Sequence, residues 1–108
     1  GLTKGAADPI LDTELMRGKE DRDRDWAEAF ALVAGTLMEQ REVSAYRIGL
    51  ETGRDPDVVR RYALGHRLPP APVVAEMARV LNIDVAALFA AVDRESERIH
   101  AERNASGG

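Results

Sequence analysis

The sequence predicts an all-α protein: a compact five-helix domain preceded by a flexible N-terminal arm. Apolar residues recur at three- and four-residue intervals in successive segments, and proline and glycine punctuate the boundaries. The 108 residues are 44% hydrophobic but only 5% aromatic, which suits one small, mainly aliphatic core. We expect three parts: the arm (1–24), the helical domain (25–92) and a polar helical extension with a tail (93–108).

The arm is expected because residues 1–24 are rich in glycine and charge and have no sustained apolar period. A mobile or loosely docked segment is the simpler interpretation, and contact with a partner subunit or DNA is the alternative, although its acidity disfavours DNA. Asp25 is expected to cap the first long helix. The apolar face of that helix follows at helical spacing: Trp26, Phe30, Val33, Leu37 and Met38.

Two short helices joined by a tight turn are predicted in the middle of the chain. Ser44 is expected to cap the first, and Gly53 to end it in the left-handed conformation. Asp55 is expected to cap the second helix, with Pro56 at its first position and Gly65 at its end. This spacing is typical of a helix-turn-helix, whose second helix is presented to a DNA major groove.

The remaining helices are separated by a proline-rich loop, Leu68 to Pro72, that a helix cannot cross. The fourth helix is expected to end at Asn82. Asp84 is expected to cap the fifth, after which the polar stretch RESERIHAERN extends it. Their apolar faces are Val73, Val74, Met77, Val80 and Leu81 in the fourth helix, and Val85, Leu88, Phe89 and Val92 in the fifth.

Three stretches, SAYRIGLETG, DPDVVRRYALGHRLP and VVAEMARVLNIDVAALF, together resemble the Cro/lambda-repressor-like (XRE-type) helix-turn-helix DNA-binding domain. The similarity needs no gaps from about Phe30 to Phe89. It implies a sequence-specific transcriptional regulator, expected to be a repressor, that occupies a palindromic operator in double-stranded DNA as a homodimer. It also implies a cytoplasmic, nucleoid-associated protein of bacterial or phage type.

The charge distribution agrees with this implication better than the net charge does. The whole chain carries a net charge of −4, but residues 41–67 hold six arginines and only four acidic residues. This is the one segment with a positive balance, and it coincides with the helix-turn-helix, where a phosphate-binding face would lie.

The resemblance implies DNA contacts at specific positions. The start of the first motif helix would sit over a phosphate, and the N-terminal half of the second would face the bases. Arg61 is ambiguous, because it could also brace the fold. The implied contacts are Ser44 and Ala45 at that phosphate; Pro56, Asp57 and Arg60 nearest the bases; and Arg47, Arg54, His66 and Arg67 at other phosphates.

Two departures from the family pattern favour an alternative function. Ala45 stands where DNA-binding members often have glutamine, and the second helix opens with the acidic pair Asp55 and Asp57. Together with the acidic net charge, these suggest a protein–protein interaction or antitoxin-like module with a protein partner and weak or no DNA binding.

The homodimer is expected to form through the last helix, because its apolar stripe continues beyond what a small domain needs. The predicted dimer contacts are Trp26, Leu88, Val92 and Ile99.

No enzyme, metal or cofactor site is predicted. The chain has no cysteine, His66 and His100 lack metal-ligand spacing, and Ser44 has no neighbouring base. We expect no membrane association, because no apolar run approaches the ~18 residues of a membrane span and no signal-peptide pattern opens the sequence.

Overall fold

A computed structural model describes residues 9–107, with side chains from 18 to 105. This part of the chain forms five α-helices and no strand, which confirms the predicted all-α class. The helices are α1 (Pro9–Arg41), α2 (Ala45–Thr52), α3 (Pro56–Ala63), α4 (Ala71–Val80) and α5 (Val85–Gly107).

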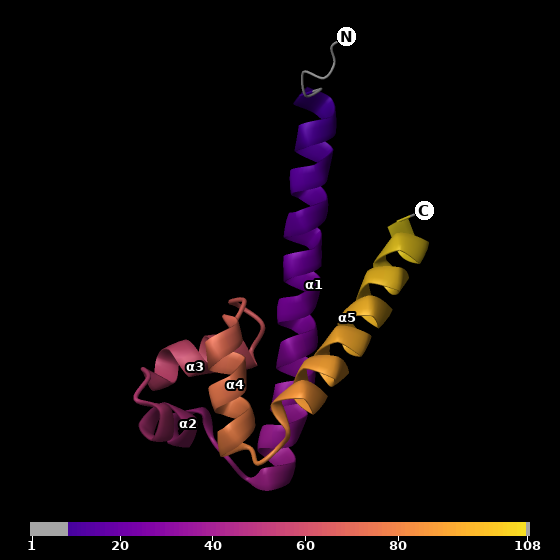
Figure 1. Ribbon diagram of the computed structural model, residues 1–108. Helices are drawn as coiled ribbons and strands as arrows, with labels where there is room; N and C mark the ends of the chain where they lie inside the picture. Colours follow the sequence, from indigo (N-terminus) through magenta and orange to yellow (C-terminus); the bar gives the residue numbers. More distant parts are fainter. Residues whose placement is uncertain (1–8, 108) are drawn as a thin grey trace.

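The two long helices form the frame of the molecule. α1 and α5 run in opposite directions, and their contacts extend from Asp21 toward the end of α1 and along most of α5 (Figure 1). The three short helices cluster beside the second half of α1: α3 contacts α1, α2 contacts α3 and α4, and α4 also contacts α5. The helix-turn-helix is therefore held on one side of the long pair.

The core draws at least one fully buried apolar side chain from each helix: Phe30, Ile48, Val59, Met77 and Leu88, in chain order. Burying such a side chain contributes about 1.5–3 kcal/mol relative to leaving it exposed. These residues and their neighbours form one continuous cluster, so the five helices share a single core.

The first helix begins earlier than the sequence suggested. α1 starts at Pro9 and runs through Asp25, so the prediction that Asp25 caps this helix is wrong. Residues 9–24 of the expected arm are helical, and residues 1–8 lie outside the described residues.

The Asp25 carboxylate is buried because α5 supplies its partners. Oδ2 lies 3.1 Å from Nδ1 of His100, and Oδ1 lies 2.5 Å from a terminal guanidinium nitrogen of Arg103. The Arg103 contact is an ion pair without aligned hydrogen-bond geometry. His100 is therefore part of a partly buried contact that joins α1 to α5.

The other helix boundaries follow the predicted local chemistry. Asp84 caps α5, since its Oδ2 accepts a hydrogen bond from the backbone N–H of Ala87 at 3.0 Å. Asn82 has a φ of 58° just after α4, and this left-handed conformation stops the helix. Within the described residues, no helix is long and apolar enough to cross a membrane.

Candidate nucleic-acid interface

The first motif helix, α2, is bounded by two residues that the sequence identified correctly. Oγ of Ser44 accepts a hydrogen bond from the backbone N–H of Arg47 at 3.1 Å. At the other end, Gly53 has a φ of 71°, in the left-handed region. Ser44 is exposed and Ala45 is half-buried, so the start of α2 faces solvent as the DNA-binding hypothesis requires.

The packing of α2 against α3 depends on Gly49, which has no room for a side chain. A Cβ at this position would lie 2.8 Å from the carbonyl oxygen of Arg54 and 2.9 Å from Cγ of Pro56. Pro56 occupies the first turn of α3, which is capped by Asp55: its Oδ1 accepts a hydrogen bond from the N–H of Asp57 at 2.9 Å. Close packing and local capping together fix the turn.

α3 has one buried face and one exposed face. Val59 is fully buried and Tyr62 is 6% exposed, and both point into the core. Asp57, Arg60 and Arg61 are exposed. Arg60 donates a hydrogen bond from a terminal nitrogen to Oδ1 of Asp57 at 2.7 Å. The outer face of α3 therefore presents an arginine already paired with a carboxylate, which the sequence reasoning missed although the i, i+3 spacing allowed it.

Arg54 is paired with a carboxylate on another helix. Its Nε and a terminal nitrogen donate hydrogen bonds to the two carboxylate oxygens of Glu76 in α4, at 2.7 and 3.0 Å. These hydrogen bonds hold the pKa of Glu76 below its usual value and raise the pKa of Arg54. The bidentate pair ties the α2–α3 turn to α4. Arg54 therefore braces the fold, and its phosphate contact stays a prediction.

The remaining basic residues of the motif differ in whether an acidic side chain already pairs with them. Arg47 forms an ion pair of 2.6 Å with Glu51, one turn along α2. His66 and Arg67 are exposed in the loop between α3 and α4. Within the described residues, the arginines of segment 41–67 that form no ion pair are Arg41, Arg61 and Arg67.

The predicted dimer contacts on α5 are not on the surface. Leu88 and Val92 are fully buried and Ile99 nearly so, all within the core of this chain. α5 packs along α1, which extends further toward the N-terminus than expected. The apolar stripe is therefore used inside the chain, and it offers no surface to a second copy.

Trp26, the fourth predicted dimer residue, also packs inside the chain. Its ring lies 6.2 Å from that of Phe30 in a stacked arrangement and 5.8 Å from that of Phe89 in a tilted one, measured between centroids. It remains half-buried. Trp26 is thus a core anchor with one accessible part.

Exposed apolar side chains form a feature that the sequence analysis did not identify. Tyr46 and Leu50, one turn apart on α2, are 62% and 64% exposed, and Leu64 at the end of α3 is also exposed. The signal was available, because an i, i+4 pair on the side of α2 opposite the buried Ile48 must face outward.

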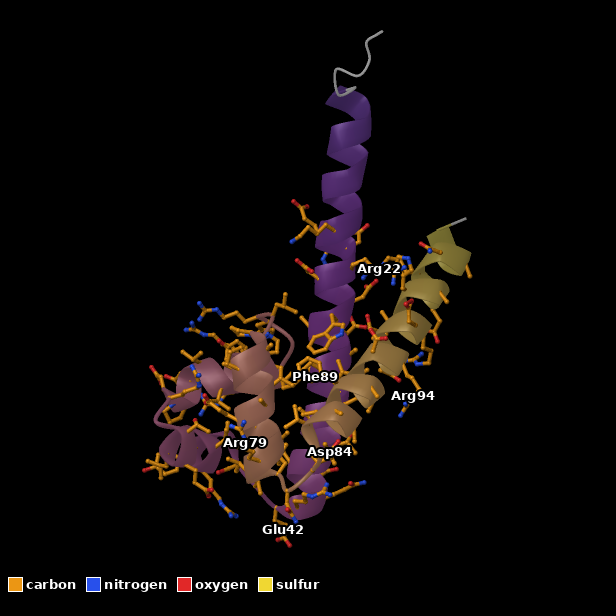
Figure 2. The ribbon with its side chains drawn as sticks, viewed as in Figure 1. Arg22, Glu42, Arg79, Asp84, Phe89 and Arg94 are labelled. Carbon is orange, nitrogen blue, oxygen red and sulfur yellow. The ribbon has the colours of Figure 1, made fainter. Side chains whose placement is uncertain are left out.

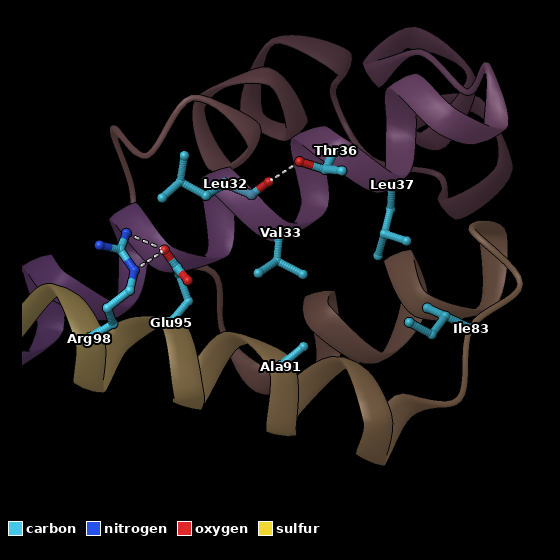
Figure 3. A pocket seen from close by; sticks show the side chains of 8 residues that line it. All are labelled: Leu32, Val33, Thr36, Leu37, Ile83, Ala91, Glu95 and Arg98. Atoms are coloured by element: carbon cyan, nitrogen blue, oxygen red, sulfur yellow. Dashed lines mark hydrogen bonds and ion pairs between the residues drawn. The ribbon is translucent and has the colours of Figure 1, made fainter.

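A second candidate site is an open groove of about 510 Å³ between α1 and α5 (Figure 3). One end is closed by Glu95, whose Oε1 accepts a hydrogen bond from Nε of Arg98 at 2.9 Å. This contact holds the pKa of Glu95 below its usual value. The groove has no convergent polar groups suited to catalysis. Its other lining residues are Leu32, Val33, Thr36, Leu37, Ile83 and Ala91.

Metal binding has no support in the described part of the chain, where no three side chains of the ligand-forming types converge. Comparison with known proteins gives no relative: no protein-family model, no curated protein and no solved structure matches the chain. The resemblance to Cro/lambda-repressor-type domains therefore rests on the quoted residues alone.

Proposed function

We propose that this protein is a sequence-specific DNA-binding transcriptional regulator that places α3 in the major groove of an operator. The observation that carries the proposal is the arrangement of α3. Val59 and Tyr62 hold it in the core, while Asp57 and Arg60 face outward from its first two turns. A helix exposed along one face after a tight turn can reach base edges.

Arg60 and Asp57 would both form hydrogen bonds with the edges of the bases. An arginine can donate two hydrogen bonds to O6 and N7 of guanine, and a carboxylate can accept one from the amino group of cytosine. The 2.7 Å contact between the two side chains restricts the guanidinium before DNA arrives. Asp57 therefore both orients Arg60 and offers an acceptor to a neighbouring base.

The backbone contacts would come from the exposed groups beside α3. Arg67 and His66 lie in the following loop, and Ser44 lies at the exposed start of α2. Such contacts position a protein on the duplex without reading its sequence.

The test is fluorescence anisotropy with a labelled random duplex at about 50 and 200 mM salt, followed by selection from a random-sequence library. Non-specific binding should have a Kd of about 10⁻⁴–10⁻⁶ M near physiological salt, and it should weaken as salt rises. Once a site is selected, Arg60→Ala should cost about 1–3 kcal/mol at one base position and relax the preference there. Arg67→Ala should weaken binding to all sequences and lower the salt slope by about one.

Arg94→Ala is the matched control, because Arg94 is exposed on α5 and points away from the helix-turn-helix (Figure 2). Asp57→Asn supplies a further test. A changed base preference supports base contact, whereas uniformly tighter binding indicates only repulsion of the backbone. If Arg60→Ala binds DNA as the Arg94→Ala control does, the proposed role of α3 is wrong.

A homodimer remains part of the proposal, with its contact surface unassigned. Two-fold pairing would set two copies of α3 about 34 Å apart and require a palindromic site. Sedimentation velocity at micromolar concentration tests this directly, and a single monomeric species with and without operator DNA would exclude it.

The second candidate is a protein–protein interaction or antitoxin-like module, and two observations favour it. Tyr46 and Leu50 expose an apolar pair on α2, and three arginines of the motif are already held by carboxylates. Absence of binding to random duplex at about 50 mM salt, where electrostatic binding is strong, would favour this module over the regulator.

A further inference from the structure

A second, smaller pocket lies where α1, α5 and the loop before α4 meet, and its volume is about 320 Å³. Trp26 and Phe89 supply its aromatic lining, and the centroids of their rings are 5.8 Å apart. Phe89 lies on the side of α5 that faces α1 (Figure 2). The opposite lining comes from Leu68, Pro69 and Ala71. The volume lies at the lower end of the range found for small-molecule sites.

One buried hydroxyl also lines this pocket. Ser96 is only 4% exposed, and it is among the residues that line the pocket. A serine hydroxyl can both donate and accept a hydrogen bond. Ser96 therefore adds one polar group to a mainly apolar lining.

The charges at the rim leave one carboxylate uncompensated. Arg22 donates two hydrogen bonds to the Glu97 carboxylate, at 2.9 and 3.2 Å. Asp23 pairs with Lys19 at 3.3 Å. Asp93 is exposed at the rim and forms no ion pair with a described residue. The charged lining residues are therefore Arg22, Asp23 and Asp93, and Asp93 is the one that has no ion pair with a described residue.

We propose that this pocket binds a small organic ammonium ion with an aromatic or apolar body. The ammonium group would lie near Asp93 and the face of Trp26, because a cation is attracted to both a carboxylate and an aromatic ring. Ser96 would accept a hydrogen bond from it, and the apolar body would pack on Phe89 and Pro69. The pocket is distinct from the outer face of α3, so the proposal goes beyond DNA binding.

The position of Trp26 makes the proposal directly measurable, because it is the only tryptophan in the chain. The full-length protein is titrated with phenethylammonium, with the neutral 2-phenylethanol and with the anion phenylacetate at constant ionic strength, and tryptophan emission is followed. We expect saturable binding of the cation, about tenfold tighter than the alcohol since a desolvated cation–π contact adds to the charge pair. Phenylacetate should give no saturable change.

Asp93→Asn should weaken binding of the cation about twofold to fivefold and leave the alcohol unchanged. Glu39→Gln is the control, because it changes the net charge equally from an exposed position near the far end of α1. It should leave both affinities unchanged. Circular dichroism checks that both variants remain folded. The proposal fails if no probe saturates up to about 20 mM, if the alcohol binds as tightly as the cation, or if Asp93→Asn behaves as Glu39→Gln does.

Discussion

Gly49→Ala is a substitution whose effect can be worked out from distances in the structure. The added methyl would lie 2.8 Å from the carbonyl oxygen of Arg54 and 2.9 Å from Cγ of Pro56. Neither a backbone oxygen nor a proline ring can rotate away, so α2 and α3 must move apart. Overpacking costs about 1–3 kcal/mol, and the higher helix propensity of alanine offsets about 1 kcal/mol. Because both obstacles are rigid, we take the upper part of the range and expect a net loss of about 1–2 kcal/mol.

Gly35→Ala is the matched control for this prediction. Gly35 lies inside α1, and a Cβ there would meet no atom within 4 Å. The same substitution should therefore stabilise the protein by about 0.5–1 kcal/mol. Thermal unfolding followed by circular dichroism should show a Tm lower by about 5–15 °C for Gly49→Ala and a few degrees higher for Gly35→Ala. If both substitutions raise the Tm equally, the contact between α2 and α3 does not limit the space at Gly49.

Three further substitutions test the other contacts that hold the fold. Ser44→Ala removes the cap of α2 and should cost about 1 kcal/mol in urea unfolding. Asp25→Ala leaves the Arg103 charge without its buried partner. This should cost about 2–3 kcal/mol, below the usual range for a buried pair because Arg103 is 34% exposed and can reach water. Glu76→Gln should destabilise the protein at neutral pH. Arg54 lowers the pKa of Glu76 in the folded state. The wild type's advantage in free energy of unfolding over Glu76→Gln is therefore complete above the pKa of this carboxyl in the unfolded state. This advantage disappears as the pH falls through the lower pKa of the folded state. An advantage that is unchanged at low pH would contradict this role.

The parts of the fold that sequence predicted correctly are those set by neighbouring residues. The side chain of Ser44 accepts a hydrogen bond from the backbone N–H three positions later in the chain. The side chain of Asp55 accepts one from the backbone N–H two positions later. Such contacts are decided by the local order of residue types. The role of Asp25 was missed for the opposite reason. The burial of Asp25 depends on His100, 75 positions along the chain, and a pattern within one helix contains no information about that partner.

The candidate site shows the same division between local and distant contacts. Sequence placed Arg60 correctly on the outer face of α3, since the apolar residues of that helix define its inner face. It could not assign Arg54, because Glu76 lies 22 positions away on another helix. It identified the apolar stripe through Val92 but not what covers it, because the packing of α5 on α1 is a contact between segments far apart in the sequence.

The opposed long helices determine how this protein can be handled. The first turn of α1 and the last turn of α5 lie toward the same end of the molecule, while α2 and α3 lie toward the other (Figure 1). A dye, an affinity tag or a surface linkage attached to the first turn of α1 or the last turn of α5 would therefore be held away from the helix-turn-helix. Immobilised protein should keep α3 accessible whichever of these two turns carries the attachment, so duplex DNA can be passed over it without the linkage blocking the face under test.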